Sequence, residues 1–461
     1  MIKMRDIFFL GLFLLAPACT HYLTVQPQGE VLPETDREFA SLLHAHLREI
    51  EGGGDEYILG NMESIALYEG IADDLDATVR NGNGLVLYAG EKLISRQNFY
   101  RDSWKVIRDC NILIEKLKGR SSATARHSLS AAYAIKGVCY WRLMREFCEP
   151  WEAGQAGRQE GLPLVDRFDI SARPVRASLA ETAEYADRLF RESLALSPDD
   201  PLYLFTEWPV KGFRLRLAFW CEDWDSVVAT GEDILAHSGF TLTPRDAYAE
   251  MIGSLNKPLG EVMLRSHTNN SSELDWYFSY IRGYVATRPA SAALVRLFGT
   301  DPSKDVRFAA SFNAKRFNVK PPECRLRLSE IVLSLAEAYV HQGEDAKALG
   351  LLNELRGQRI EGVVPYTAAT LPPVRSGDRI TEDCTGAALT PLMQAVFDER
   401  RREMYMEGDR WFELKRNGRP EWWVISNSMK YTTKAYMYTS PIYKGDVDMD
   451  PRVKQNPGYV Y

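Results

Sequence analysis

Apolar residues recur at helical spacing along much of the chain. The first stripe contains Phe39, Leu43 and Leu47, and it predicts a helix over 35–50 that begins at Thr35. The segment 178–196 begins with Ser178 and carries Glu181 three residues later, which is a capping box. The same spacing predicts further helices over 104–117, 128–147, 213–220 and 225–236. Consecutive helices of this kind form antiparallel pairs, so the sequence predicts a mainly helical body.

The clearest helix pair covers residues 328–356. Large and small apolar residues alternate there at the spacing of a tetratricopeptide unit, and Gly343 lies between the two helices. The residues are Leu335, Ala336, Tyr339, Ala348, Leu352 and Leu355. Long stretches without helical periodicity cover 241–322, 357–390 and 422–461. Loops of this length in a compact protein are usually functional, so we expect a ligand site among them.

The N-terminal residues are typical of an export signal. Lys3 and Arg5 precede a short apolar run over 7–16, which is too short to span a bilayer. Small residues then precede Cys19, as in a bacterial lipobox. We therefore expect a signal peptide over 1–18, lipidation of Cys19 and a soluble body tethered to a membrane. The alternative is an ordinary signal peptide that happens to precede a cysteine.

Composition and charge narrow the classes of function. The chain has 461 residues, with 56 Lys+Arg against 63 Asp+Glu, and the net charge of −7 argues against a nucleic-acid binder. The 10 Trp, 22 Tyr and 19 Phe would suit a flat, amphipathic ligand if some are exposed. We expect mostly free, buried thiols at Cys110, Cys139, Cys148, Cys221, Cys324 and Cys384, because neither a CxxC motif nor metal-ligand spacing occurs among them.

The acidic residues give little support to catalysis or metal binding. Adjacent carboxylates, as in 73–74 and 382–383, point apart on a helix or a strand, so we expect solvated loop acids there rather than a glycosidase pair. Asp446, Asp448 and Asp450 alternate like part of a calcium loop, but they lack the glycine and closing glutamate of an EF-hand. The sequence therefore predicts neither a catalytic residue, a metal site nor a cofactor.

A dense run of charges covers 399–410. Glu399 with Arg402, and Glu407 with Arg410, have i,i+3 spacing, which places each pair on one face if a single helix holds them all. Phe397, Met404, Trp411 and Leu414 form an apolar stripe beside the charges. We interpret the run as partly buried, structural ion pairs rather than as an acid–base centre, because it contains neither a histidine nor a nucleophile.

Five short motifs, in order along the chain, resemble the SusD/RagB family of outer-membrane nutrient-uptake lipoproteins. Residues 22–29 (YLTVQPQG) are similar to the family's opening LDVxPxG, with Thr24 in place of aspartate. The other four are 161–165 (GLPLV) with 173–178 (RPVRAS), 327–338 (RLSE through LAEA), 399–414 (ERRRE through EGDRWFEL) and 455–459 (QNPGY). The shared order and spacing of these motifs extend over nearly the whole chain.

The resemblance implies a SusD-like fold, in which tetratricopeptide-like helix pairs support a large loop-rich portion. It divides the chain into an N-terminal region over 19–240 and a C-terminal region over 241–461, which carries the last helix pair and the ligand-binding part. It also implies a non-catalytic lipoprotein at the surface of the outer membrane. Such proteins bind an oligosaccharide, or sometimes a peptide, and deliver it to a TonB-dependent transporter of the SusC type.

An aromatic cluster is the leading candidate for the ligand site. Trp276, Tyr277, Tyr280 and Tyr284 lie together in the longest irregular stretch, with Asn270 beside them. Aromatic rings stack on the apolar faces of sugars, while amides and carboxylates bind the hydroxyl groups. The same rings could instead fill the core. Further candidates are Tyr88 in a glycine-rich turn, and Trp422, Trp423, Tyr436 and Tyr438 near the C-terminus.

Two other functions stay open at this point. A helical-repeat lipoprotein could organise envelope proteins without binding any small ligand. A glycan hydrolase is the third reading. Binding of a glycan by the purified protein separates the first two functions, and slow release of product would indicate the third.

Overall fold

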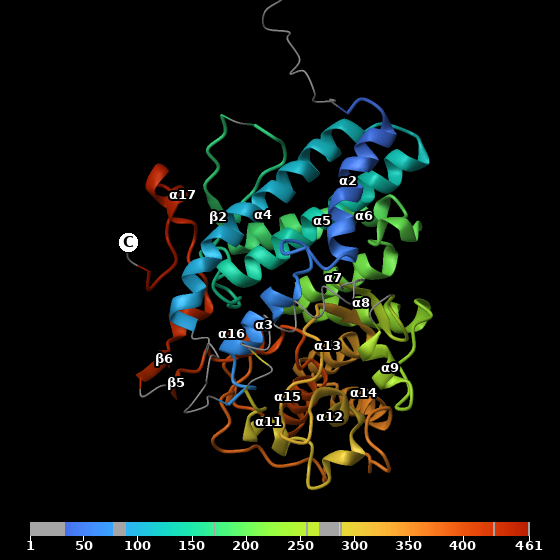
Figure 1. Cartoon of the computed structure of the whole chain (residues 1–461), viewed down its shortest axis with the longest axis vertical. Coiled ribbons are helices and arrows are strands. Elements are labelled where there is room, and N and C mark those ends of the chain that lie inside the picture. Colours follow the sequence, from blue (N-terminus) through green and yellow to red (C-terminus); the bar gives the residue numbers. More distant parts are fainter. Residues whose placement is uncertain are drawn as a thin grey trace, which may run out of the picture.

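The computed structural model describes residues 33–76, 89–169, 171–254, 257–266, 285, 288–426 and 429–459. Within them the protein is mainly helical, as the sequence predicts, and its few strands form three separate two-stranded sheets (Figure 1). None of the described helices combines the length and the apolar character that a membrane crossing needs.

Helices α2 (Asp36–Glu51), α4 (Ala89–Leu117), α5 (Ala123–Phe147) and α6 (Leu179–Ala195) build the upper half of the molecule in Figure 1, around the buried α5. Helix α3 (Met62–Ile71) lies lower, beside α16 (Arg410–Arg416). Helix α5 contacts α2, α4 and α6, and most of its side chains are buried. The capping boxes at Thr35 and Ser178 are both present, so the predicted starts of α2 and α6 are confirmed.

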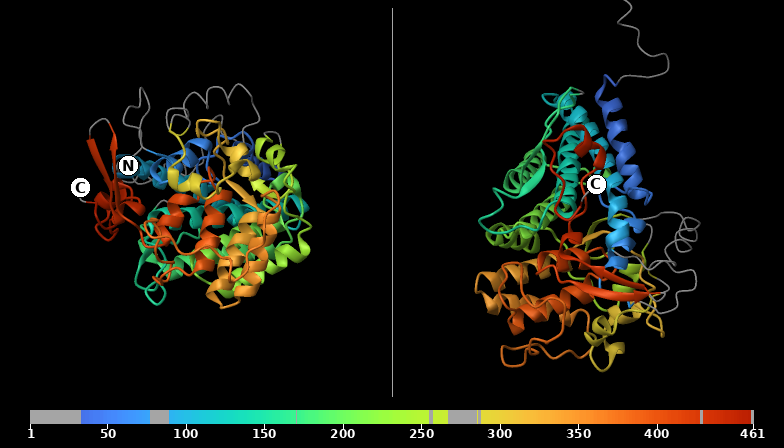
Figure 2. Two further views of the ribbon diagram at one scale, coloured as in Figure 1. Left: turned by 90° about the horizontal axis from the view of Figure 1, so that it is seen from below. Right: turned by 90° about the vertical axis from the view of Figure 1, so that its left-hand side faces the viewer.

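Two further helix pairs extend the scaffold downwards (Figures 1 and 2). They are α7 (Glu207–Trp220) with α8 (Trp224–His237), and α13 (Leu328–His341) with α14 (Asp345–Gly357). Helix α13 packs against α8 as well as α14, so these two pairs share a core. Ala336 and Ala348 are fully buried where α13 meets α14, which confirms the predicted use of small residues for close approach. Gly343 has φ = +74° at the turn between the two helices.

The remaining described elements lie between and after these helices. The helical ones are α9 (Tyr248–Gly253), α11 (Ala292–Arg296), α12 (Val306–Ser311), α15 (Pro391–Glu403), α16 (Arg410–Arg416), α17 (Lys444–Met449), η2 (Pro201–Tyr203), η4 (Pro302–Lys304) and η5 (Ala435–Tyr438). The antiparallel strand pairs are β1 (Glu160–Pro163) with β2 (Arg176–Ser178), β3 (Val262–Arg265) with β4 (Arg325–Arg327), and β5 (Trp422–Ser426) with β6 (Met429–Thr433).

The charged run over 399–410 does not form one helix, so that prediction is wrong. Helix α15 ends at Glu403 and α16 begins at Arg410. Between them, Met406 has φ = +60° and Gly408 has φ = +73°, a conformation that ends a right-handed helix. As a result Glu399 still pairs with Arg402, whereas Glu407 and Arg410 face different partners.

Candidate ligand-binding site

Backbone hydrogen bonds join the described residues that flank two of the candidate segments. Leu75 and Ala290 form an antiparallel bridge, and the Asp76 amide donates to the Pro289 carbonyl over 2.9 Å. The Arg288 guanidinium secures the same junction by donating to the carbonyls of Gly70 (2.6 Å) and Leu75 (2.8 Å). The chain before the Tyr88 turn therefore lies beside the chain that follows the aromatic segment.

A cavity of about 300 Å³ opens at this junction. Its wall comes from the end of α3, from α11, from the loop at 377–379 and from the β5–β6 hairpin. Eight of the lining residues carry charged or aromatic side chains: Asp73, Asp76, Arg288, Arg296, Asp378, Arg379, Arg401 and Trp422. The third candidate segment, at 422–438, thus reaches the same cavity through Trp422.

Asp73 is a buried carboxylate in this wall, and it is bound by arginines. Arg410 Nε lies 2.7 Å from Asp73 Oδ1, while Arg379 and Arg401 each lie 3.4 Å from Oδ2. Burial by itself raises the pKa of Asp73, but the neighbouring guanidinium groups outweigh it and hold that pKa well below the usual range. The carboxylate is consequently ionised, and it fixes Arg379 at the cavity wall.

The guanidinium group of Arg379 lies over the aromatic ring of Trp422 at the cavity wall. Its guanidinium carbon lies 4.6 Å from the centre of the Trp422 ring, within the range of a cation–π contact. The side chain is 36% exposed, so its remaining N–H groups can reach a ligand. Guanidinium donors and carboxylate acceptors around an aromatic surface can bind hydroxyl groups and the apolar face of a ring together.

The candidate aromatics at 422–438 divide between core and surface. Tyr438 is buried and stacks on Trp411 with the ring centres 4.3 Å apart, and the largely buried Trp422 packs edge-on against Tyr438. Alternation along the strand turns Trp423 to the opposite face, where it is 55% exposed. Tyr436 packs edge-on against Tyr459. Of this group, only Trp422 belongs to the cavity.

The leading candidates fall outside the described residues. This holds for Trp276, Tyr277, Tyr280 and Tyr284, and also for Tyr88 and for the lipidation candidate Cys19, all of which stay predictions. The charged lining residues Asp76, Arg288, Arg296 and Arg379 were missed from the sequence. A signal existed for one of them, because Arg288 follows the aromatic cluster by only four residues.

The expectation of solvated loop acids is wrong for 73–74. The side chains of Asp73 and Asp74 are both buried, and Asp74 accepts a hydrogen bond from Arg401 Nε over 2.6 Å. Asp383 is buried as well, and it accepts hydrogen bonds from the backbone amides of Thr385 and Ala387 within a tight turn. These acids are bound by arginines or backbone amides, and the sequence did not reveal those distant partners.

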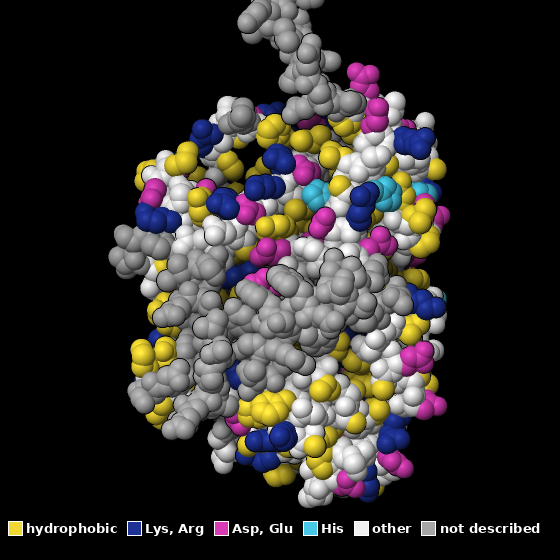
Figure 3. Space-filling view, in the orientation of Figure 1, with side chains coloured by type: hydrophobic (Ala, Val, Ile, Leu, Met, Phe, Trp, Pro, Cys, Tyr) yellow, Lys and Arg dark blue, Asp and Glu magenta, His cyan; other side chains and the backbone are white. Residues whose placement is uncertain are grey.

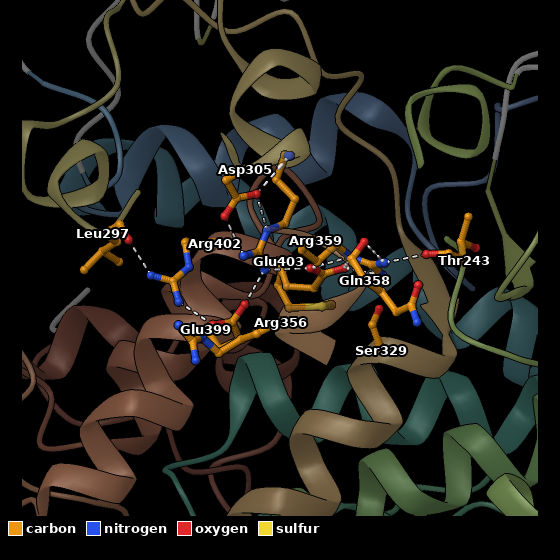
Figure 4. A network of polar contacts seen from close by, with 12 residues as sticks. Thr243, Leu297, Asp305, Ser329, Arg356, Gln358, Arg359, Glu399, Arg402 and Glu403 are labelled. Atoms are coloured by element: carbon orange, nitrogen blue, oxygen red, sulfur yellow. Dashed lines mark hydrogen bonds and ion pairs between the residues drawn. The ribbon is translucent and has the colours of Figure 1, made fainter. Parts of the chain in front are cut away.

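The charged residues within 399–407 form a buried network, part of which is drawn in Figure 4. Arg359 donates to Glu403 over 3.0 Å, and Arg307 donates to it over 2.9 Å. Arg359 also donates to the buried Glu261 over 2.9 Å. Burial alone raises the pKa of Glu403, but these arginines and Arg327 hold it well below the usual range.

Glu407 is bound from the other side of the same network. Lys320 Nζ lies 2.7 Å from Glu407 Oε1, and Arg327 donates to both carboxylate oxygens. Despite the opposing effect of burial, Arg327 and Lys320 lower the pKa of Glu407 to about 2. Cations that enclose a carboxylate so completely leave it unable to accept a substrate proton, which supports the structural interpretation of the run.

All six described cysteines are free thiols, as expected. Cys110, Cys139 and Cys148 are fully buried, whereas Cys221, Cys324 and Cys384 are half-buried.

Known proteins resemble this chain in part of its sequence and in its fold. Residues 304–459 match the model of the SusD family. The fold is similar to that of a SusD superfamily protein from Bacteroides thetaiotaomicron VPI-5482, with 19% identity, a TM-score of 0.69, and coverage of 92% of this chain and 100% of that chain. No curated protein sequence gives a significant match.

Two further solved structures share the fold. One is a SusD-like carbohydrate binding protein from Bacteroides vulgatus ATCC 8482, with 16% identity, a TM-score of 0.64, and coverage of 91% of this chain and 98% of that chain. The other is a laminarin binding SusD-like protein, with 14% identity, a TM-score of 0.60, and coverage of 92% and 99%. These identities establish a shared fold only. The match of residues 304–459 to the SusD family model and the shared fold support the resemblance of this chain to the SusD/RagB family that the sequence motifs predict.

Proposed function

We propose that this protein binds an oligosaccharide at the bacterial cell surface and delivers it, chemically unchanged, to a partner transporter. The observation that carries this proposal is the convergence at one cavity. Asp76 and Arg288 flank two candidate segments, Trp422 belongs to the third, and all three residues line the same space. The names of two relatives with this fold, which specify carbohydrate and laminarin binding, support the choice of ligand.

The chemistry of the cavity suits a neutral, hydroxyl-rich ligand. Its lining offers guanidinium donors, carboxylate acceptors and the Trp422 ring. On the face drawn in Figure 3, basic and acidic side chains are interspersed over the described surface. An uncharged sugar needs no field of one sign for its capture. Within this proposal, Trp276, Tyr277, Tyr280 and Tyr284 stack on sugar rings.

The proposed setting is the outer membrane. A signal peptide over 1–18 directs export, Cys19 carries the lipid anchor, and the body lies on the cell surface. The partner is a TonB-dependent transporter of the SusC type. The loop-rich region over 241–461 carries most of the ligand site, and the region over 19–240 supplies helix pairs. The family match over 304–459 supports this setting.

Three buried carboxylates, Asp73, Asp74 and Glu407, are unsuited to hydrolysis. A glycosidase needs two carboxyl groups that face the scissile bond, one of which can give up a proton. Asp73, Asp74 and Glu407 are instead bound by arginines or a lysine. Their surroundings support a protein that holds a glycan without cleaving it.

The proposal is tested by titrating the purified full-length protein, in mild detergent, with neutral oligosaccharides of different linkage and with peptides. Calorimetry measures binding, and chromatography of the recovered ligand measures cleavage. We expect saturable binding of at least one glycan and recovery of the intact ligand. If no glycan binds while envelope proteins co-purify, the scaffold function is favoured. If shortened products accumulate, the protein is a hydrolase.

A further inference from the structure

A histidine, a cysteine and a glutamate meet away from the cavity described above. Glu337 and His341 lie one turn apart on the same face of α13, and Cys384 approaches them from the long loop between α14 and α15. Their ligand atoms all lie within 4.8 Å of one another. Cys384 Sγ is 3.8 Å from His341 Nε2, and Glu337 Oε1 is 4.0 Å from the same nitrogen.

These separations are close to those of a tetrahedral zinc site. Zinc bonds of about 2.0 Å to nitrogen or oxygen and about 2.3 Å to sulfur place neighbouring ligand atoms roughly 3.3–3.6 Å apart. The observed sulfur–nitrogen separation of 3.8 Å needs to close by a few tenths of an ångström, and the oxygen–nitrogen separation of 4.0 Å by about 0.7 Å. At 4.0 Å, the glutamate and the imidazole are too far apart for a direct hydrogen bond.

The surroundings prepare the imidazole for coordination. The Trp224 ring stacks on His341 with the ring centres 4.2 Å apart and the planes inclined by 11°, which fixes the orientation of the imidazole. A fixed ring orientation serves a ligand nitrogen.

Further charged side chains lie near the cluster. Glu222 lies in the turn between α7 and α8, and its Oε1 atom is buried without a hydrogen-bond partner. Arg416 donates to Glu337 and partly neutralises the charge of that carboxylate.

We infer that His341, Cys384 and Glu337 bind a Zn²⁺ ion. Binding forms a zinc–thiolate bond, and the thiol proton leaves to solvent. The ion would tie helix α13 to the loop that carries Cys384, and water would complete the tetrahedral coordination.

The test measures zinc affinity of the full-length protein in mild detergent, with all thiols reduced by a phosphine, in competition with a chromophoric chelator. We expect one equivalent of zinc to bind. Removing a group that only hydrogen-bonds to a metal ligand weakens metal affinity by about 10–100-fold. Removing a ligand itself, as in His341→Ala or Cys384→Ser, should weaken zinc affinity at least as much. The matched controls are His237→Ala and Cys324→Ser, whose side chains lie outside the cluster, and both should bind zinc like the parent.

A second measurement needs no variant. Cobalt replaces zinc in such sites, and a bound thiolate gives an intense sulfur-to-cobalt absorption band in the near ultraviolet. We expect this band on adding Co²⁺ to the parent protein and its loss on adding Zn²⁺. Absence of the band overturns the proposal, because Cys384 is then not a ligand. Zinc affinity that is unchanged in both His341→Ala and Cys384→Ser overturns it as well.

Discussion

Glu69 is a fully buried carboxylic acid on α3, close to the junction at Asp76. Its Oε1 atom accepts a hydrogen bond from the Gly408 amide over 2.8 Å, while Oε2 has no hydrogen-bond partner. Burial, together with the nearby Asp74 carboxylate, raises the pKa of Glu69 from 4.5 to about 8. At neutral pH this side chain is therefore mostly protonated in the folded protein and ionised in the unfolded chain.

This difference makes the stability depend on pH. The unfolded chain loses the Glu69 proton near pH 4.5, whereas the folded state keeps it until about pH 8. The contribution of Glu69 to the free energy of unfolding therefore falls as pH rises from about 5 to about 9. Glu69→Gln stays neutral and keeps an acceptor for Gly408. We expect the melting temperature of this variant, relative to the parent, to increase steadily across that range.

Glu63→Gln is the control, because this glutamate is exposed on the same helix. A constant difference in melting temperature between Glu69→Gln and the parent at every pH would contradict the proposed ionisation.

Arg410 is a buried cation whose loss should reduce stability. It donates to Asp73 over 2.7 Å and to Glu413 over 2.6 Å. Removing one partner of a buried ion pair leaves an uncompensated charge and costs about 3–5 kcal/mol. We expect Arg410→Ala to melt at a clearly lower temperature, measured by circular dichroism, whereas the exposed pair of Arg452 with Asp450 should tolerate Arg452→Ala. An unchanged melting temperature with lost glycan binding would instead assign Arg410 a direct role in the site.

At the scale of elements, helices with local signals could be predicted and the break between α15 and α16 could not. Thr35 and Ser178 start their helices through contacts within four residues, which any reader of the sequence can find. The charges of 399–410 also fit helical spacing. Their true partners, Lys320 for Glu407 and Asp73 for Arg410, lie far away in the sequence. Tertiary ion pairs thus override the local pattern.

The hairpin β5–β6 was missed for a related reason. Trp422 and Val424 line the cavity, while Trp423 and Ile425 are exposed on the opposite face. Because both faces carry apolar side chains, no alternation of apolar and polar residues marked the strand. Aromatic richness indicated the right neighbourhood of the site, but the charged lining became visible only when the chain was folded.

Gly408 lies in the turn between α15 and α16, where the backbone packs closely against Ile65. Substitution by alanine measures how close this packing is. A Cβ atom at this position would lie 2.9 Å from Ile65 Cδ1, and the backbone has φ = +73°. Gly343 has nearly the same angle, +74°, but open space around it. Adding a side chain at φ > 0 costs about 1–2 kcal/mol. We expect Gly343→Ala to lose about that much stability in denaturant unfolding and Gly408→Ala to lose more.

The difference between these two variants measures the close approach of the α15–α16 turn to α3. Equal losses would show that Ile65 moves aside freely and that only the backbone angle matters.

At the scale of the whole molecule, we expect a lipid anchor at Cys19 to tether the folded body to the membrane. Cys19 follows small residues at the end of the apolar run, so we expect it to carry the lipid. Cys19→Ala should move the protein from the membrane fraction to the soluble fraction after cell lysis, measured by detergent phase partitioning and immunoblotting. The Cys324→Ser variant should remain in the membrane fraction. Unchanged partitioning of Cys19→Ala would exclude this anchor.

The described ends of two candidate segments meet beside Trp422, and this long-range convergence is the central observation. It requires α3, α11 and the β5–β6 hairpin to be held together. Buried arginines fix the first of these parts, since Arg401 and Arg410 reach from α15 and α16 to Asp73 and Asp74 just after α3. The buried ion pairs thus lie directly beside the proposed ligand site, because Asp73 and Arg401 belong to both.

The most direct test of this account measures glycan affinity by calorimetry for Trp276→Ala, Tyr280→Ala and the double variant. Each stacked ring contributes about 0.5–1.5 kcal/mol beyond the area it buries, so we expect each single variant to bind about two- to tenfold more weakly and the double variant more weakly still. Trp423→Ala is the control, because its ring is exposed on the face of the hairpin that points away from the cavity, and it should bind like the parent. Folded Trp276→Ala and Tyr280→Ala variants that bind the glycan with parental affinity would contradict the account.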